Sequence, residues 1–264
     1  MIAIIGAGKM GEALLAGLLG TGYDPTDVMV VEPLPDHAAQ LRERYSVDTV
    51  TAAEAARRAR TIVLAIKPQD MVSVLDGLAA DIPAGTLVIS VAAGITTGVL
   101  EKHLPGEVAA VRAMPNTPAL VGKGMTAIAG GLHATDEHLE RAESLLSTVG
   151  TVVRVPERHM DTVTAISGSG PAYFYFIAET MIDAGVGMGM PRATAQRLVQ
   201  QTIEGAAAML NESGEHPVVL REAVTSPGGT TAAAVRELDR HGVRTAFADA
   251  IEAARDRSRA LSEG

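Results

Sequence analysis

The sequence predicts an α/β protein in two parts, a doubly wound parallel sheet followed by an all-helical domain. Short apolar runs alternate with Ala-rich helical patterns up to residue 155, which is typical of strand–helix–strand units. A glycine-rich loop separates the first apolar run from the first helical pattern. No convincing strand pattern occurs after Pro156. We therefore expect one domain over residues 1–156 and a second over residues 157–264, since the chain is long enough for two small domains.

The strands are predicted from short runs of apolar residues. The first run, Met1-Ile2-Ala3-Ile4-Ile5, has no polar alternation, which indicates a strand buried on both faces. The later runs have the same character, and the last two are expected to extend the sheet. The predicted strands are residues 1–5, 28–32, 61–66, 86–91, 107–112, 125–129 and 151–155.

The helices are predicted from alanine-rich stretches between these runs and from longer helical patterns after them. In the first part they are expected over residues 12–19, 36–45, 52–60 and 136–148. In the second part, Pro191 suits a helix start, and Gly185, Gly187 and Gly189 mark the end of the preceding helix. The predicted helices of this part are residues 158–186, 192–211, 217–224, 230–240 and 244–261.

The loop Gly6-Ala7-Gly8-Lys9-Met10-Gly11 has the spacing G-x-G-x-x-G, with a strand before it and a helix after it. The first glycine allows a tight turn, the second lets a pyrophosphate approach the backbone, and the third lets helix and strand pack closely. Glu32 ends the second strand, where this fingerprint expects an acid for the ribose hydroxyls. The first part is therefore predicted to be a Rossmann-type dinucleotide-binding domain.

Glu32 also bears on which nicotinamide nucleotide binds. A carboxylate there repels a 2′-phosphate and favours NADH, and no Arg or Lys occurs between Glu32 and Arg42 to pair with that phosphate. Pro33 and Pro35 make the loop unusual, so a Glu32 that points away from the ribose is the alternative. Both NADH and NADPH remain candidates.

Three further strand ends are candidate cofactor contacts, because ligands bind beyond the carboxyl ends of parallel strands. Ile66-Lys67-Pro68 follows the third long strand, and Lys67 is either a phosphate or ribose ligand or a solvated loop lysine. Ala92 lies in a stretch of small residues that leaves room for a nicotinamide ring. Met114 and Asn116 follow the next strand, and Asn116 offers a donor and an acceptor to an amide.

A second glycine loop, Ser226-Pro227-Gly228-Gly229-Thr230-Thr231, leads into an alanine-rich helical run. The unpaired N–H groups and the dipole of a helix start form a ready anion site. Helix capping by Ser226 or Thr230 is the simpler interpretation, and it is compatible with binding. Two anion sites of different character suggest a cofactor and a small acidic substrate.

The segment Ser167-Gly168-Ser169-Gly170-Pro171 is unusual inside a predicted helix, because glycine and proline there cost about 1 and 3 kcal/mol. We expect close backbone packing at this segment, against a ligand or another subunit. Residues 173–176 then hold four of the seven aromatic residues and are expected to anchor a subunit interface.

Composition excludes several classes of function. The net charge of −9 and the absence of a basic cluster argue against nucleic acid as a partner. No cysteine is present, and no histidine pair has metal-ligand spacing, so no metal site is expected and the seven histidines are read as surface or structural. The mean hydropathy of +0.19 is high, yet no segment reads as a membrane span. We expect a cytoplasmic protein with apolar surface buried between subunits.

The motifs supply no histidine or lysine for moving the proton of an alcohol, apart from Lys67 near the cofactor. An imine needs less help, because it can arrive protonated on nitrogen and is then a strong electrophile. Holding it against the nicotinamide contributes about 7–11 kcal/mol through proximity and orientation. A hydroxyl that hydrogen-bonds the nitrogen is then sufficient, and Thr231 at the helix start is well placed.

Over its full length the chain resembles the pyrroline-5-carboxylate reductase family, the enzymes of the last step of proline biosynthesis. The resemblance rests on five segments: Gly6 to Gly11, Ala65 to Pro68, Ala113 to Pro118, Ser167 to Tyr173 and, above all, Leu220 to Asp239. It implies an NAD(P)H-dependent oxidoreductase that reduces L-1-pyrroline-5-carboxylate to L-proline. It also implies that the helical domains of two subunits interlock in a homodimer, and that dimers assemble into a larger ring.

The resemblance also implies roles for individual residues. The Ser226 hydroxyl and the N–H groups of Gly229 and Thr230 would bind the substrate carboxylate, and Thr231 would hydrogen-bond the ring nitrogen. These groups would act on the cofactor of the partner subunit. Many family members prefer NADPH, whereas Glu32 favours NADH.

Two other functions are alternatives to a pyrroline-5-carboxylate reductase. A β-hydroxyacid or 6-phosphogluconate-type dehydrogenase would need a lysine on the first long helix of the second domain, but residues 157–264 contain none. A non-catalytic NAD(P)-sensing protein would need a partner surface or nucleic-acid domain that the sequence does not reveal.

Overall fold

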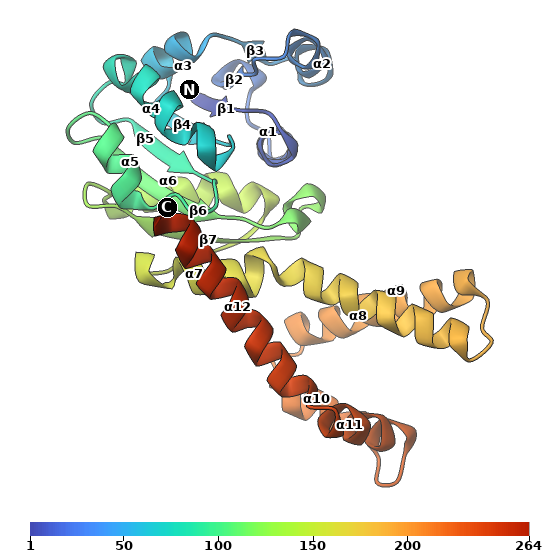
Figure 1. Cartoon of the computed structure of the whole chain (residues 1–264). Helices are drawn as coiled ribbons and strands as arrows, with labels where there is room; N and C mark the ends of the chain where they lie inside the picture. Colours follow the sequence, from blue (N-terminus) through green and yellow to red (C-terminus); the bar gives the residue numbers. More distant parts are fainter. Residues whose placement is uncertain (264) are drawn as a thin grey trace. The chain divides into compact units, whose positions relative to one another are not determined.

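The structure, a computed structural model, describes residues 1–263 and contains one eight-stranded sheet (Figure 1). The strand order is β3-β2-β1-β4-β5-β6-β7-β8, and all neighbours are parallel except β6 and β7. The first six strands thus form the doubly wound order that the sequence predicts. The strands are β1 (Ile2–Ile5), β2 (Val28–Val31), β3 (Asp48–Thr49), β4 (Thr61–Leu64), β5 (Leu87–Ser90), β6 (Ala109–Met114), β7 (Gly124–Gly130) and β8 (Gly150–Arg154).

The register aligns the carboxyl ends of the parallel strands. Ile5 lies opposite both Val31 and Leu64, and Leu64 lies opposite Ser90. The loops that leave these strands therefore emerge at one edge of the sheet, which is where the sequence predicts the cofactor.

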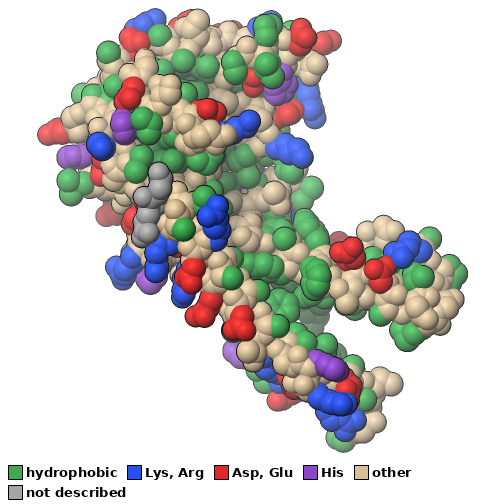
Figure 2. Space-filling model, in the orientation of Figure 1, with side chains coloured by type: hydrophobic (Ala, Val, Ile, Leu, Met, Phe, Trp, Pro, Cys, Tyr) green, Lys and Arg blue, Asp and Glu red, His purple; other side chains and the backbone are tan. Residues whose placement is uncertain are grey.

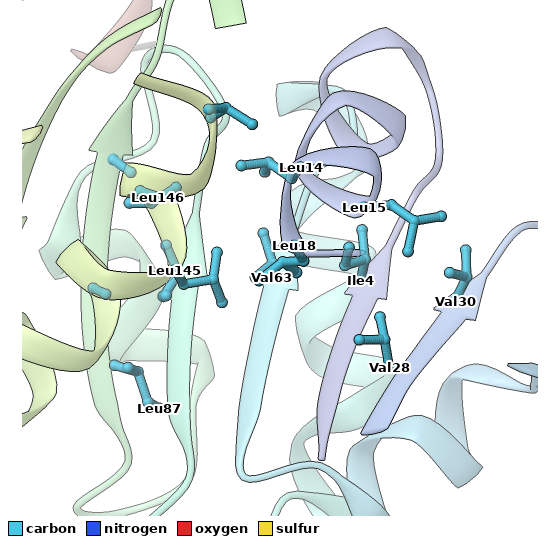
Figure 3. Packing of buried hydrophobic residues seen from close by; sticks show 14 of the residues in the cluster. Ile4, Leu14, Leu15, Leu18, Val28, Val30, Val63, Leu87, Leu145 and Leu146 are labelled. Atoms are coloured by element: carbon cyan, nitrogen blue, oxygen red, sulfur yellow. The ribbon is translucent and has the colours of Figure 1, made fainter. Parts of the chain in front are cut away.

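Both faces of the sheet are covered, because alternate side chains of each strand enter different cores. Ile4 of β1 packs with one buried cluster, and Ala3 and Ile5 pack with the other. Figure 3 shows the first cluster, in which Leu14 and Leu18 of α1 lie over the sheet. The continuous apolar runs of the strands follow from this burial on both sides.

Helices surround the sheet and make up the second part of the chain. They are α1 (Lys9–Gly20), α2 (Pro35–Tyr45), α3 (Ala52–Arg58), α4 (Met71–Leu78), α5 (Thr97–His103), α6 (Asp136–Leu146), α7 (Met160–Val163), α8 (Gly170–Gly187), α9 (Arg192–Glu212), α10 (Pro217–Ala223), α11 (Thr230–Arg240) and α12 (Val243–Glu263). The helix predicted over residues 158–186 is interrupted: a π-helical segment, Thr164–Gly168, lies between α7 and α8.

The chain forms two compact units, and their limits differ from the predicted domain boundary. The first unit comprises Met1–Ser169 and the segment from Ala254 onward, and the second comprises Gly170–Ala253. Residues 157–169 join the sheet unit because Met160 packs with Ala127 and Ala129 of β7. The last turns of α12 join it because the Ser258 hydroxyl donates to Asp161 Oδ1 at 2.8 Å. The domain boundary between residues 156 and 157 stays a prediction.

The helical unit, residues 170–253, has almost no core of its own. Its buried residues are Gly170, Ala195 and Val199, and α8 packs against α9. Phe174, Phe176 and Met188 are 61%, 68% and 83% exposed. Figure 2 shows hydrophobic side chains at the surface of this unit. Within the described residues, no helix combines the length and the apolar character needed to cross a bilayer.

Candidate functional site

The predicted pyrophosphate site is built at the start of α1. Gly6 has φ +91°, a conformation that glycine adopts at little cost, and its N–H donates to Val31 O at 2.9 Å. Gly8 precedes α1 without a side-chain cap, and Glu12 N–H is bonded to Gly8 O. The N–H groups of the first helical turn therefore have no acceptor within α1 and suit a phosphate.

The three glycines of this loop meet different surroundings. A Cβ on Gly6 would lie 2.6 Å from Ala65 O, and one on Gly11 would lie 2.0 Å from Gly6 O. Both glycines thus permit close backbone packing. A Cβ on Gly8 would meet nothing within 4 Å, so the space beside it is open to a ligand. The surroundings fit a dinucleotide, while the cofactor roles of Ala7, Lys9 and Met10 remain predictions.

The Glu32 carboxylate lies against the glycine loop. Its Oε1 accepts from Leu34 N–H at 3.0 Å, and its Oε2 lies 3.4 Å from Ala7 N. His37 Nδ1 lies 3.2 Å from the same Oε2. The side chain of Glu32 is only 7% exposed, so this acid is held in place and does not swing in solvent.

Other predicted cofactor residues gather at the same sheet edge. The strand β4 is followed by Ile66 and by the exposed residues Lys67 and Pro68. A Cβ on Gly6 would lie 2.9 Å from Ile66 Cγ2. Ala92 follows β5, is 5% exposed, and donates its N–H to Ser90 Oγ. The structure thus brings these residues together in the first unit. Whether each contacts the cofactor remains a prediction.

Asn116 has a clear structural role. Its Nδ2 donates to Ser167 O at 3.0 Å, and its Oδ1 accepts from Met125 N–H at 2.9 Å. A side chain predicted to meet an amide of the cofactor thus ties the π-helical segment to the start of β7. Each amide atom keeps one more hydrogen-bonding position, so a cofactor contact stays a prediction.

Gly168 explains part of the unusual Ser-Gly-Ser-Gly-Pro segment. A Cβ there would lie 2.6 Å from Met114 Cε, so this glycine lets the π-helical segment approach the end of β6. π-Helical turns often occur at functional sites. The backbone packs closely here, but the partner that the structure shows is Met114 of the same unit, and packing against a ligand or another subunit stays a prediction.

The predicted substrate loop, Ser226 to Thr231, belongs to the helical unit. Gly228 has φ +70°, and Gly229 N–H donates to Ser226 O at 3.0 Å. A Cβ on Gly229 would lie 2.4 Å from Ser226 Oγ, so glycine is needed to keep this hydroxyl beside the backbone. Because Gly229 N–H is used in the turn, the N–H groups of the first turn of α11, beginning with Thr230, are the available anion donors.

Thr231 is half-buried at the second position of α11, whereas Ser226 and Thr230 are exposed. No side chain caps this helix start. The capping interpretation of Ser226 and Thr230 is therefore not supported, and their hydroxyls are left for a ligand.

The predicted site residues thus fall into two groups, the cofactor residues in the first unit and the substrate loop in the second. Sequence reasoning missed His37, which it treated as a surface or structural residue. Its position five residues after Glu32 and in the first turn of a predicted helix was the available signal.

A doubly wound sheet whose glycine loop suits a pyrophosphate, followed by a helical unit with a candidate anion loop, is the arrangement of a dinucleotide-dependent oxidoreductase. Residues 1–94 match the family model "NADP oxidoreductase coenzyme F420-dependent", and residues 157–261 match "Pyrroline-5-carboxylate reductase dimerisation". The chain belongs to the pyrroline-5-carboxylate reductase family.

Individual relatives support this membership. The chain is 46% identical to pyrroline-5-carboxylate reductase of Mycobacterium tuberculosis, covering 98% of the chain and 96% of the relative. It is 43% identical to that of Corynebacterium melassecola, over 99% and 98%. The solved reductase of Coxiella burnetii superposes with a TM-score of 0.95 at 37% identity, covering 99% and 98%. That of Plasmodium falciparum, solved with NADP bound, gives 0.87 at 31%, covering 99% and 97%.

Proposed function

We propose that this protein reduces the C=N bond of L-1-pyrroline-5-carboxylate to give L-proline, with NAD(P)H as the hydride donor. Family membership supports the reaction. The observation that supports the site assignment is the Ser226–Thr231 loop, where a glycine turn places the Ser226 hydroxyl beside a helix start that has no side-chain cap, a combination that suits an anion. A cyclic imino acid has the two groups that such a loop recognises, a carboxylate and a basic nitrogen.

The residues of the loop then have distinct tasks. Ser226 Oγ and the N–H groups at the start of α11 bind the carboxylate, favoured by the helix dipole. Thr231 Oγ1 hydrogen-bonds the ring nitrogen and fixes the ring for attack at the neighbouring carbon. A nicotinamide nucleotide held by the glycine loop of the first unit would supply the hydride for that carbon, and the π electrons of the protonated C=N bond would become the lone pair of the amine nitrogen. Most of the rate enhancement comes from positioning.

We also propose how the protein assembles. The helical unit matches a dimerisation model and leaves large apolar side chains exposed, which supports a homodimer whose helical units pack together. A larger ring of dimers, a substrate loop that acts on the partner's cofactor, and a cytoplasmic location remain predictions.

The reaction is tested by the oxidation of NADH and of NADPH, in parallel, with pyrroline-5-carboxylate as the substrate. Proline formation that matches the loss of reduced nucleotide establishes the activity. A folded sample that binds the nucleotide and oxidises neither form would refute the substrate assignment.

A further inference from the structure

A hollow of about 320 Å³ lies at the amino-terminal edge of the sheet, opposite the edge that carries the glycine loop. Ile2 begins β1 and Thr61 begins β4, and both line the hollow. The loops predicted to hold the cofactor leave the other ends of these two strands, at Gly6 and Ala65. A strand of four residues is about 13 Å long, so the hollow is separate from the pyrophosphate site.

The inner wall of the hollow is apolar, apart from one hydroxyl. Ile2 and Leu145 pack with the buried cluster shown in Figure 3, where Leu145 lies on the side of α6 that faces the sheet. Thr61 is 3% exposed, and its hydroxyl has no hydrogen-bond partner among residues 1–263. Polar groups that are this deeply buried are normally satisfied by protein or by ordered water. The hollow is the open space beside Thr61, so an occupant that carries an acceptor would supply the missing hydrogen bond.

Arg60 makes one side of the rim cationic. None of the residues that line the hollow is acidic, and Arg60 forms no ion pair in the described part of the chain. Its backbone is held on both sides, because its N–H donates to Met1 O at 3.1 Å and its carbonyl accepts from Leu87 N–H at 3.0 Å. The exposed guanidinium group therefore extends from a fixed place beside the hollow.

Arg141 on α6 makes the other side of the rim cationic. Its Nη2 lies 3.2 Å from Glu137 Oε1, but the Glu137 side chain is 81% exposed. Such an exposed pair is weak, and the guanidinium group keeps further N–H donors. Ser144 lies three residues further along α6, so its hydroxyl is on the same face of the helix. Two guanidinium groups around one small hollow repel each other, and an anion between them removes that repulsion.

We infer that this hollow binds a small phosphate monoester with an apolar body. Two guanidinium groups match the charge of a phosphate dianion and offer paired N–H donors to its oxygens. The apolar wall takes the body. The volume is at the small end of the range for small-molecule sites, so the body is a single ring or a short chain. The site depends neither on the proposed reductase activity nor on the residues of the glycine loop and the substrate loop.

Phenyl phosphate is a suitable probe, because it joins a phosphate monoester to one apolar ring. Calorimetry measures its binding to the full chain at about pH 8, where the phosphate is a dianion. NADP⁺ is present at saturation, so that the glycine loop is occupied. The protein should bind phenyl phosphate more tightly than inorganic phosphate, which lacks the ring, and more tightly than benzoate, which carries a single charge. A preference for either of these two anions over phenyl phosphate would overturn the assigned class of ligand.

Substitutions in the lining show whether the binding belongs to this hollow. Arg60→Gln and Arg141→Gln should each weaken the binding of phenyl phosphate roughly tenfold, since each removes a charged donor. Thr61→Val keeps the shape of the side chain without its hydroxyl, and it should weaken binding roughly fivefold. The matched control is Arg58→Gln, which also breaks an exposed ion pair between residues one turn apart on a helix, but lies outside the hollow. It should bind the probe as wild type does.

The methyl groups of Ile2 report where the probe binds. In protein labelled at its isoleucine methyl groups, phenyl phosphate should shift the NMR signal of Ile2 and leave that of Ile66, beside the glycine loop, in place. A shift of Ile66 without one of Ile2 would overturn the inference. Equal affinity for phenyl phosphate in wild type and in the double variant Arg60→Gln, Arg141→Gln would do so as well. Neither readout involves turnover, so a protein that reduces no imine would still decide whether the site exists.

Discussion

At the scale of single residues, Thr231 is the group that we expect to act most directly in the chemistry. It lies half-buried at the start of α11. The donors that the loop Ser226–Thr231 offers are its hydroxyls and its backbone N–H groups. Thr231→Ala should lower kcat by roughly 10- to 1000-fold, as the loss of one positioned donor does. Thr231→Ser, which keeps the hydroxyl, should retain most of the rate. Steady-state kinetics decide the point, and a wild-type kcat in the alanine variant would refute the assigned role.

Gly11 gives a second prediction at this scale, about stability. A Cβ there would lie 2.0 Å from Gly6 O, a backbone atom that cannot move without opening the loop. Gly11→Ala should therefore lower the free energy of unfolding by about 1–3 kcal/mol or more, as overpacking does. In the exposed helix position Gly77, a Cβ meets nothing within 4 Å. Gly77→Ala should stabilise by about 0.5–1 kcal/mol, because alanine favours helix.

Urea unfolding of the two alanine variants tests this contrast. If both variants changed the free energy of unfolding by the same amount in the same direction, the close contact with Gly6 O would not be the reason that glycine is required at Gly11. Motif spacing alone predicts the special role of Gly6, Gly8 and Gly11. It cannot predict His37 or Asn116, because their contacts depend on side-chain rotamers and on elements far apart in sequence.

At the scale of elements, a buried ion pair holds three segments together. Arg112 on β6 is 2% exposed and donates to Glu157 Oε1 at 2.8 Å, and Thr97 N–H at the start of α5 lies 3.4 Å from the same oxygen. Arg112 Nη2 and Glu157 Oε2 are buried without a hydrogen-bond partner. Removing the acid would leave a buried guanidinium without its counter-charge.

Glu157→Ala should therefore destabilise the protein by up to about 3 kcal/mol, toward the low end for buried pairs because Glu157 is itself 31% exposed. Arg112→Met combined with Glu157→Ala should recover part of this loss, since no unpaired charge remains. A double-mutant cycle in urea measures the coupling. Additive losses would mean that the pair contributes nothing beyond the packing of each side chain.

The elements that the sequence predicts best are those with long, uniform patterns. The seven predicted strands are present with ends shifted by at most two residues, because most of them are apolar runs buried on both faces. The strand β8 is the exception, since its Val153 is 40% exposed. β3 was not predicted, since Asp48 and Thr49 form a strand only by pairing with β2. α4 and α5 were not predicted either, since they are short and contain Gly77 and Gly98. The π-helical segment depends on its contacts with Met114 and Asn116.

At the scale of the whole molecule, the apolar composition of the chain indicates an assembly, which the helix pattern of the second unit does not. The helices form close to the predicted positions, but the unit buries only Gly170, Ala195 and Val199. A unit of this size cannot offset its conformational entropy with so little buried apolar surface. The high mean hydropathy of the chain indicates that apolar surface is left exposed in the single chain. The sequence does not identify the chain that covers this surface.

α8 is where this argument is most direct. Apart from Glu179 and Asp183, the helix carries no charged residue, and such a largely apolar surface is typical of helices that are buried in a core or in a membrane. None of the described helices qualifies as a membrane span, and Phe174, Tyr175 and Phe176 are each more than half exposed in the single chain. The match of residues 157–261 to a dimerisation model supports our proposal that the helices of a second copy cover α8.

Phe176→Asp should therefore abolish the dimer at micromolar concentration, because an unpaired charge would be buried at its centre. Sedimentation should show a monomer, with loss of helical content and of proline formation. The control is Leu132→Asp, which makes the same change at an 84%-exposed residue of the sheet unit and should leave the dimer intact. A Phe176→Asp variant that sediments as wild type would show that α8 is not covered by a second copy. The prediction that the substrate loop of one subunit acts on the cofactor of its partner would then lose its physical basis.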